Sequence, residues 1–498
     1  MRLLLSVLLF ISITALFCAE IRDGKLWLEI HILNSKQIDL STEGSFQISE
    51  IGSPLSGEFS GDVKLQIVAQ DEQKMWGIIN HIEVVNPDSI KLYQDENIRE
   101  KFVWQDGKLA IQSERLFFEN KYFTDLKTAE KYASETGYSA RQICPVPMHS
   151  ASLKVTPSKG KERFFQLPVQ LRFSEDVSFN HSNNLFQGEF TIKPVKAELC
   201  LLNHIDIESY VAGVVPNEIG NLAPEEALKV QAVAARTHAV SLLLQNKHIN
   251  DGYDLCSSTH CQVFKGNHLQ NDEVRSAVLE TTNSVLIYAD RIADTVYHSS
   301  CGGKTETNQA AWNGKPISFL QGVACYPELE SLNLSLEINA VKWLETNTDN
   351  ADMSSWEKRA ESWERIISRH SLASDNKVKN LHALKVLSRG NSGRIMKLKL
   401  IGSNEVTIEG EYKIRQALGG LPSSFFYVSN GRKTSTATYS LPEKIIIKGK
   451  GFGHGVGLCQ VGALRKARAG WLWLDILAYY YPGVSVTDNW LDFHSEKR

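Results

Sequence analysis

The sequence is poor in several features that mark specialised protein classes. Its 498 residues include only 14 Pro and 33 Gly, which argues against a disordered or fibrous chain. The 54 Lys and Arg residues nearly balance the 57 Asp and Glu residues, so the basic excess of a nucleic-acid-binding protein is missing and no nucleic-acid partner is expected. With 42% hydrophobic residues the chain is expected to be globular, in roughly two to four domains.

Long apolar runs are also scarce, and the clear example stands at the N-terminus. Arg2 precedes an apolar stretch from Leu3 to Phe17, a pattern typical of an export signal over residues 1–19. A membrane span needs about 20 apolar residues, so retention of this segment as an anchor is the alternative. Cys18 leaves lipidation open, although Phe17 is bulky for the residue before a modified cysteine. We expect an exported protein of the periplasm or cell envelope.

Cysteine is infrequent, with 8 in the whole chain. Removal of a signal containing Cys18 would leave an odd number, which does not form a complete set of disulfides. An oxidising compartment favours disulfide formation, so a metal site or a free buried thiol must account for at least one unpaired cysteine.

The hydrophobic pattern predicts an α+β protein. Alternating apolar residues, such as those from Leu26 to Ile32, predict a β-rich N-terminal domain over residues 20–195, with one helix over Asp125–Glu135. The style of the sequence changes near Lys196, and residues 196–487 read as a mixed α/β catalytic domain. It begins with a short strand over Leu199–Leu202, an acidic turn and a long helix from Pro224 to Leu244. A polar helical insertion is predicted over about residues 329–380, where Ser354 opens a capping box. There Trp356, Trp363, Ile366 and Ile367 are expected on one helical face.

Glu218 is the first candidate for chemistry, because it follows Val214-Val215-Pro216-Asn217 and precedes Ile219. A carboxyl among buried apolar residues is favoured in its uncharged form and can act as a general acid. The alternative is a solvated glutamate with buried neighbours. Arg236 lies on the predicted long helix among small residues; it can hold an anion, orient Glu218 or form a structural salt bridge.

A second candidate is a cluster of thiols and imidazoles. Cys256, His260 and Cys261 fall within six residues, with His248 upstream. Zinc takes four nitrogen or sulfur ligands in a tetrahedron, and a compact loop can supply three. A disulfide between Cys256 and Cys261 explains the same spacing, and the local sequence does not separate the two readings.

Two glycine-bearing segments complete the candidates. His298 and Lys304 belong to a predicted strand and polar turn, and His454 and Gln460 to a glycine-rich run between a predicted strand and helix. The run lacks the register of a nucleotide-binding loop. Its glycines are expected to allow close backbone approach, which would bring His454 and Gln460 to the edge of a cleft. A core histidine bonded to the backbone is the competing reading of His454.

Taken in order, these segments resemble the stage II sporulation protein D family. The resemblance covers about Lys196 to Val486, and the segments that carry it are Leu202–Glu218, Gln231–Thr237, Cys256–Phe264, His298–Thr305, Ser388–Arg394, Ile414–Gly419, Gly451–Gly457 and Tyr480–Gly483. Leu458-Cys459 departs from the usual Met-Ser before the glutamine, and the predicted insertion and the N-terminal domain are extra.

The resemblance implies a lytic transglycosylase that cleaves peptidoglycan glycan strands lacking stem peptides. Glu218 matches the family's catalytic glutamate, Arg236 a residue lining the cleft, and His298 and Lys304 the adjoining turn. Some members bind a structural zinc near the cleft, which makes Cys256, His260 and Cys261 candidate ligands, with His248 or His298 as the fourth.

Two other functions remain open from the sequence. One is a non-catalytic glycan-binding protein that enhances a cell-wall amidase, the expected functional partner. The other is a zinc hydrolase, which the cysteine-rich ligand set disfavours because catalytic zinc usually keeps an open position. Division and sporulation would use the same residues, so the sequence does not choose between them.

Overall fold

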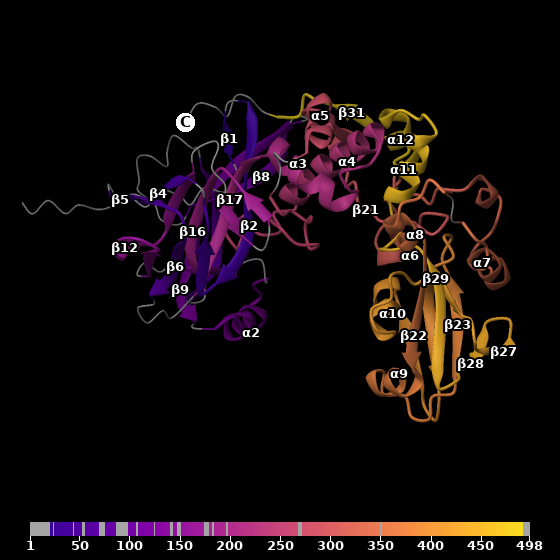
Figure 1. Cartoon of the computed structure of the whole chain (residues 1–498). Coiled ribbons are helices and arrows are strands. Elements are labelled where there is room, and N and C mark those ends of the chain that lie inside the picture. The colour runs from indigo at the N-terminus through magenta and orange to yellow at the C-terminus, as the bar shows by residue number, and fades with distance from the viewer. Residues whose placement is uncertain are drawn as a thin grey trace, which may run out of the picture. The chain divides into compact units, whose positions relative to one another are not determined.

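The protein is described here from a computed structural model (Figure 1). The structure describes residues 20–22, 24–42, 44–51, 55–68, 75–85, 98–105, 108–123, 125–139, 143–146, 151–173, 179–181, 184–195, 198–266, 271–348 and 351–491. The fold is mixed α+β, with a β-rich N-terminal part followed by mixed segments, which confirms the predicted class. The predicted signal over residues 1–19, with Cys18, lies outside the described residues. Among the helices of the described residues, none is long and apolar enough to cross a bilayer.

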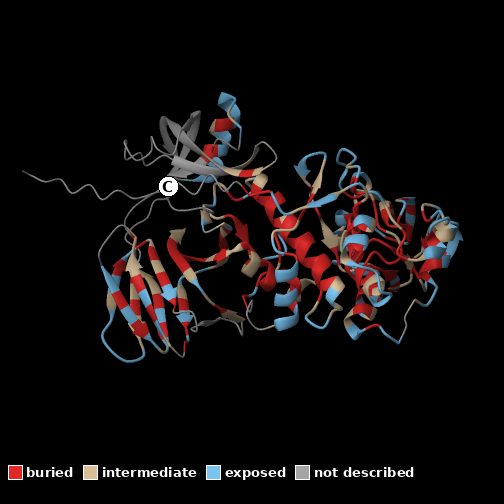
Figure 2. Cartoon of the chain, turned by 90° about the horizontal axis from the view of Figure 1, so that it is seen from above, coloured by how far each residue is buried: buried red, intermediate tan, exposed pale blue. Residues whose placement is uncertain are grey.

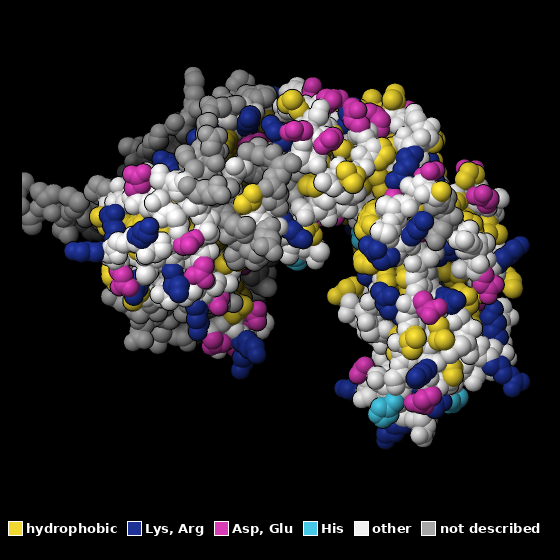
Figure 3. Space-filling model, viewed as in Figure 1, with side chains coloured by type: hydrophobic (Ala, Val, Ile, Leu, Met, Phe, Trp, Pro, Cys, Tyr) yellow, Lys and Arg dark blue, Asp and Glu magenta, His cyan; other side chains and the backbone are white. Residues whose placement is uncertain are grey.

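The chain forms two compact units that interleave along the sequence. Unit 1 takes the described residues within Met1–Asn217, Ala239–Arg275 and Asn489–Arg498, and unit 2 takes those within Glu218–His238 and Ser276–Asp488. The domain boundary predicted near residue 195 stays a prediction, although β16 (Glu189–Val195) pairs directly with β17 (Glu198–Asp206) across it. On the face drawn in Figure 3, side chains of both charge signs are interspersed.

Antiparallel sheets dominate unit 1. The largest follows the order β1-β2-β17-β16-β13-β4-β5, with β18 (Leu255–Cys256) pairing parallel to β2 (Lys25–Ser35). The other strands of this sheet are β1 (Glu20–Arg22), β4 (Ser45–Glu50), β5 (Ser56–Ser60) and β13 (Val169–Phe173). The remaining sheets comprise β3 (Gln37–Leu40), β6 (Val63–Val68), β7 (Met75–Val85), β8 (Ile98–Gln105), β9 (Lys108–Phe123), β10 (Ile143–Val146), β11 (Ser152–Pro157), β12 (Arg163–Gln166), β14 (Phe179–His181) and β15 (Asn184–Phe186).

The alternation of apolar and polar residues in the sequence corresponds to an alternation of buried and exposed side chains along these strands. In β4 the buried residues Phe46 and Ile48 alternate with exposed neighbours, and in β13 Val169, Leu171 and Phe173 are buried (Figure 2). Successive strand side chains point to opposite faces, so this pattern places one face against the core. The predicted helix near Asp125 is also confirmed as α2 (Leu126–Thr136), which Asp125 caps through the backbone N–H of Thr128 at 2.9 Å.

Two consecutive helices follow β17. The first, α3 (Ile207–Glu218), was not predicted, because an acidic turn was expected there. Asp206 starts it by accepting hydrogen bonds from the backbone N–H groups of Glu208 and Ser209 at 3.1 and 3.2 Å. The second, α4 (Glu225–Leu244), matches the predicted long helix, and its first turn carries Glu225 and Glu226 as the helix dipole favours.

Unit 2 combines short helices with small sheets. Its helices besides part of α4 are α5 (Asp272–Glu280), α6 (Asn308–Trp312), the 3₁₀ helix η2 (Pro327–Leu329), α7 (Glu337–Leu344), α8 (Ser355–Glu361), α9 (Arg369–Asp375), α10 (Glu411–Ala417), α11 (Gln460–Arg468) and α12 (Trp473–Tyr480). Its strands are β19 (Val285–Tyr288), β20 (Arg291–Ile292), β21 (Tyr297–His298), β22 (Ser362–Ser368), β23 (Ala383–Arg389), β24 (Ile395–Ile401), β25 (Glu405–Glu409), β26 (Phe426–Val428), β27 (Arg432–Ser435), β28 (Thr438–Ser440), β29 (Lys444–Lys450), β30 (Leu458–Cys459) and β31 (Ser485–Thr487).

The prediction of a helical insertion over residues 329–380 is only partly right. The capping box at Ser354 is present, with both of its hydrogen bonds, and starts α8. The prediction that an apolar helical face continues beyond it was wrong, because residues 362–368 form β22, which pairs antiparallel with β29. Trp363 is buried while Ile366 is exposed, so these residues do not share one helical face.

Candidate functional site

Glu218 is the last residue of α3, and it is half-buried. Its neighbours in the sequence, Val214, Val215 and Ile219, are buried. The chain then leaves the helix through Gly220, whose φ of +87° favours glycine. The role of Glu218 as a general acid stays a prediction.

Arg236 lies on α4 and is fully buried. Its Nη1 atom donates a hydrogen bond to the backbone carbonyl of Ser284 at 3.0 Å. Thr237 next to it donates to Val233 and accepts from the backbone N–H of Leu286 at 3.0 Å, so this part of α4 is tied to the start of β19. Burial of the guanidinium favours a positioning role within unit 2 over direct contact with a polymer.

His298 is the last residue of β21, and Lys304 lies in the turn that follows. His298 is buried and its Nδ1 atom lies 3.0 Å from the backbone carbonyl of Val456, whereas Lys304 is half-buried. Arg394, from the Ser388–Arg394 segment, is buried and donates to the carbonyl of Cys301 at 2.9 Å. The turn is therefore held in place by buried polar contacts from elsewhere in unit 2.

The glycine-rich run packs against the same turn. A Cβ added at Gly455, where φ is +84°, would lie 2.4 Å from the guanidinium carbon of Arg394, so the close approach predicted for these glycines is confirmed. His454 is half-buried, with Nε2 2.9 Å from the carbonyl of Tyr297, and Gln460 is buried and donates to Gln231 at 3.2 Å. Desolvation, and then the nearby His298, lower the pKa of His454 well below its ordinary value.

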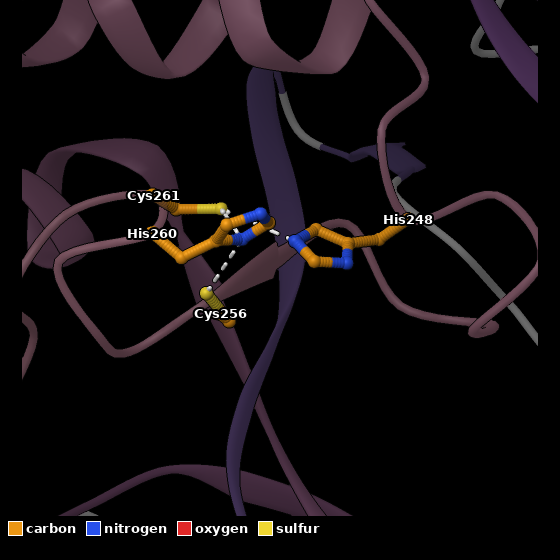
Figure 4. Close-up of side chains that lie close together, drawn as sticks. All are labelled: His248, Cys256, His260 and Cys261. Atoms are coloured by element: carbon orange, nitrogen blue, oxygen red, sulfur yellow. Dashed lines mark hydrogen bonds between the residues drawn. The ribbon is translucent and has the colours of Figure 1, made fainter. Parts of the chain in front are cut away.

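The four predicted metal ligands come together in unit 1 (Figure 4). Ligand atoms of His248, Cys256, His260 and Cys261 all lie within 4.8 Å of one another. The Nε2 atom of His248 is 3.3 Å from the Cys261 sulfur, and the Nδ1 atom of His260 is 3.6 Å from the Cys256 sulfur. His248, one of the two alternatives for the fourth ligand, lies in this cluster, and the ligand set stays a prediction. His298 belongs to unit 2.

The surroundings of this cluster suit a metal. The Nδ1 atom of His248 is 2.9 Å from a carboxylate oxygen of Asp251, the outer contact that orients ligating histidines. The hydrogen bond from Cys261 outweighs desolvation and lowers the pKa of the Cys256 thiol well below its ordinary value, which favours the thiolate that binds metal. Cys256 and Cys261 are both free thiols in this structure, so the alternative disulfide is not formed here.

A second group of potential ligands was not predicted as a site. His298, Cys301 and Cys459 in unit 2 are all buried, and their ligand atoms also lie within 4.8 Å of one another. The sequence offered one signal for it, since Cys301 follows His298 by three residues, but Cys459 lies far along the chain.

Comparisons with known proteins found matches to two regions of the chain. A family model described as stage II sporulation protein matches residues 196–288, and a second, described as a domain of unknown function, matches residues 306–457. An uncharacterised protein of Brachyspira hyodysenteriae is 30% identical over 324 residues, which cover 64% of this chain and 76% of that protein.

Two named relatives are more distant. The stage II sporulation protein D of Bacillus subtilis is 26% identical over 300 residues, or 58% of this chain and 76% of the relative. An amidase enhancer of the same species is 28% identical over 298 residues, or 55% of this chain, and the match covers only 40% of that relative's length.

Proposed function

We propose, because the chain belongs to the stage II sporulation protein D family, that it is a lytic transglycosylase of the cell envelope. Its substrate is the peptidoglycan glycan strand lacking stem peptides, the polymer on which that family is expected to act. The observation that carries the proposal is the position of Glu218, half-buried at the end of α3 among buried apolar residues.

Glu218 acts first as an acid. A carboxyl at the C-terminal end of a helix meets the negative end of the helix dipole, which favours its uncharged form. In that form Glu218 donates its proton to the glycosidic oxygen as the bond to the anomeric carbon breaks. The leaving sugar departs as an alcohol.

Glu218 acts next as a base. As a carboxylate it accepts the proton of the 6-hydroxyl of the same muramic acid residue, whose oxygen attacks the anomeric carbon and closes a 1,6-anhydro ring. Hydrolytic glycosidases generally use two carboxyl groups, one of which activates water or forms a covalent intermediate. An internal nucleophile removes that requirement, so one carboxyl that alternates between acid and base is sufficient.

Residues outside α3 are assigned supporting roles in this proposal. Lys304 and His454 are both half-buried, and each is proposed to contact the glycan strand. Arg236 is proposed to fix the geometry of α4 from within, because its guanidinium is buried. Gln460 is buried against Gln231, so we assign it a positioning role as well.

A structural zinc is proposed at His248, Cys256, His260 and Cys261. Two thiols and two imidazoles are a donor set that zinc binds tetrahedrally, and four protein ligands leave no open position for water. This closed set argues against the zinc hydrolase. Bound zinc would cross-link the loop over residues 248–261 and would not take part in the reaction.

A second function rests on the similarity to an amidase enhancer. In that case the chain would bind glycan strands and stimulate a cell-wall amidase without cutting the strands itself. Incubation of denuded glycan strands with the full chain separates the two functions. Release of soluble fragments supports the enzyme, whereas strands that sediment with the protein and stay intact support the enhancer.

A further inference from the structure

The group of His298, Cys301 and Cys459 in unit 2 is built from two segments that are distant in the sequence. β21 and β30 pair in parallel, and their register places His298 opposite Cys459. Cys301 follows in the turn after β21, and its backbone N–H donates to the Cys459 sulfur at 3.2 Å. The sheet register and this turn therefore hold one imidazole and two thiols together, with their ligand atoms within 4.8 Å of one another.

His298 is oriented as a metal ligand would be. Its side chain is 4% exposed, and Nδ1 is 3.0 Å from the carbonyl of Val456, so Nδ1 carries the proton and donates it. The Nε2 atom then presents a lone pair, and no partner for it is found among the described residues. A buried polar atom left without a partner is unfavourable, because it has lost its hydrogen bonds to water. A metal ion accepting this lone pair removes that cost, and a carbonyl on the other ring nitrogen is the usual outer contact.

Backbone N–H groups point at the two sulfurs. Cys459 accepts from the N–H of Gly462 at 3.3 Å in addition to that of Cys301, and Cys301 accepts from Gly303 at 3.3 Å. Such donors stabilise negative charge on sulfur, which is the form of cysteine that binds metals. Two backbone donors therefore point at the Cys459 sulfur and one at the Cys301 sulfur, although burial raises the pKa of the Cys301 thiol.

A fourth ligand is at hand in Cys325. It is buried, its backbone N–H bonds to the carbonyl of Gly303 at 2.8 Å, and its sulfur lies 3.1 Å from the hydroxyl of Tyr480. Cys325 lies outside the group whose ligand atoms are all within 4.8 Å of one another, so its sulfur would move toward the other three ligands to complete the set. Three sulfurs and one imidazole nitrogen form a common tetrahedral zinc set.

We propose that unit 2 binds a second zinc ion through His298, Cys301, Cys325 and Cys459. The ion would join the turn carrying Lys304 to the start of α11 and to the loop before η2. In this arrangement His298 is a metal ligand rather than a contact for the glycan strand. The proposal does not depend on whether the chain cleaves glycan strands.

Zinc content and sulfur ligation of the full chain test the proposal. The protein, purified under reducing conditions and equilibrated with zinc sulfate, is expected to retain two zinc ions per chain by elemental analysis. X-ray absorption at the zinc edge is expected to give an average of about 2.5 sulfur ligands per zinc, since one site supplies two and the other three. One zinc per chain with two sulfur ligands would overturn the second site, and so would a mapped disulfide between any two of Cys301, Cys325 and Cys459.

Variants then assign each ion to its cluster. The double variant Cys256→Ser/Cys261→Ser is expected to lose one of the two zinc ions and to raise the average sulfur count of the remaining one to three. The double variant Cys301→Ser/Cys459→Ser is expected to lose the other ion. Cys200→Ser is the matched control, because Cys200 is also a buried free thiol but lies outside both clusters, and it should keep both ions. Loss of all zinc from the first variant, with its fold intact by circular dichroism, would contradict the proposal.

Discussion

At the scale of single residues, the candidate site depends on which side chains are charged and what they touch. That Cys256, His260 and Cys261 lie together could be predicted because they stand in one short segment, whereas the role of Glu218 stays a prediction. The group of His298 and Cys459 could not be predicted, because it arises from strand pairing between positions 161 residues apart, and nothing in either segment alone indicates the other. The burial of Arg236 could not be predicted from the sequence either, since its small neighbours are compatible with both a cleft and a core.

Glu218→Gln is expected to abolish strand cleavage while leaving strand binding unchanged. The amide has almost the same shape but cannot donate and then reclaim a proton, and a general acid or base contributes about 10²–10⁴-fold to the rate. Fragment release from denuded strands and cosedimentation with the strands provide the two measurements. Glu208→Gln, a change of the same type in the first turn of α3, is the control and should retain activity. A Glu218→Gln variant that cleaves at the original rate would remove the acid–base role.

Asp251→Asn is expected to weaken zinc binding at the first cluster by about 10–100-fold. The Asp251 carboxylate orients His248 from 2.9 Å, and loss of such outer contacts lowers metal affinity by this factor. Competition with a chromophoric chelator measures the change. Asp272→Asn is the control, because Asp272 pairs only with the exposed Arg275 at 3.2 Å among the ion pairs of the described residues. Equal affinity in the two variants would mean that His248 does not bind the metal as proposed.

At the scale of helices and strands, local signals decided what could be predicted. Pro224, Glu225 and Glu226 predicted the start of the long helix α4, and the capping box predicted the start of α8; both helices begin there. β22 was misread as helix because a short apolar run fits either structure, and its partner β29 lies about 80 residues further along. α3 was missed because the cap at Asp206 was read as part of a turn.

An ion pair between α8 and α11 gives a prediction about how the stability of the fold depends on pH. Glu357 in α8 is buried and accepts two hydrogen bonds from Arg468 of α11, at 2.7 and 2.8 Å. Burial acts to raise the pKa of Glu357, but Arg468 and the cap at Ser354 outweigh it, and the pKa is lowered. A lowered pKa in the folded state means that this contribution to stability is present at neutral pH and is lost as the pH falls through the folded-state pKa.

Glu357→Gln is therefore expected to reduce the free energy of unfolding by about 1–3 kcal/mol at pH 7, because it removes the charge-assisted hydrogen bonds to Arg468, whose side chain is partly exposed. The difference from wild type should shrink as the pH is lowered below about 4. Urea titrations followed by tryptophan fluorescence measure both effects. Glu364→Gln breaks an exposed pair with Lys448 and should cost less than about 1 kcal/mol at either pH. A pH-independent difference for Glu357→Gln would refute the electrostatic explanation.

At the scale of the whole molecule, the fold class followed from composition and periodicity. The predicted domain boundary near residue 195 relied on a change in sequence style and stays a prediction, whereas the two compact units alternate along the chain, with changes at residues 217, 239 and 275. Contacts between residues distant in the chain decide such an arrangement, and no local pattern reports them. The family resemblance was confirmed, because it depended on the order of several motifs rather than on any one of them.

The chemistry of the newly formed chain end tests the central claim most directly. Purified glycan strands without stem peptides are incubated with the full chain, and the soluble products are analysed by mass spectrometry. The account predicts fragments that end in 1,6-anhydro-muramic acid, each lighter by one water than its hydrolysed counterpart. Fragments with reducing ends would contradict an internal nucleophile, and strands left uncut by a folded, zinc-loaded protein would contradict the enzyme itself.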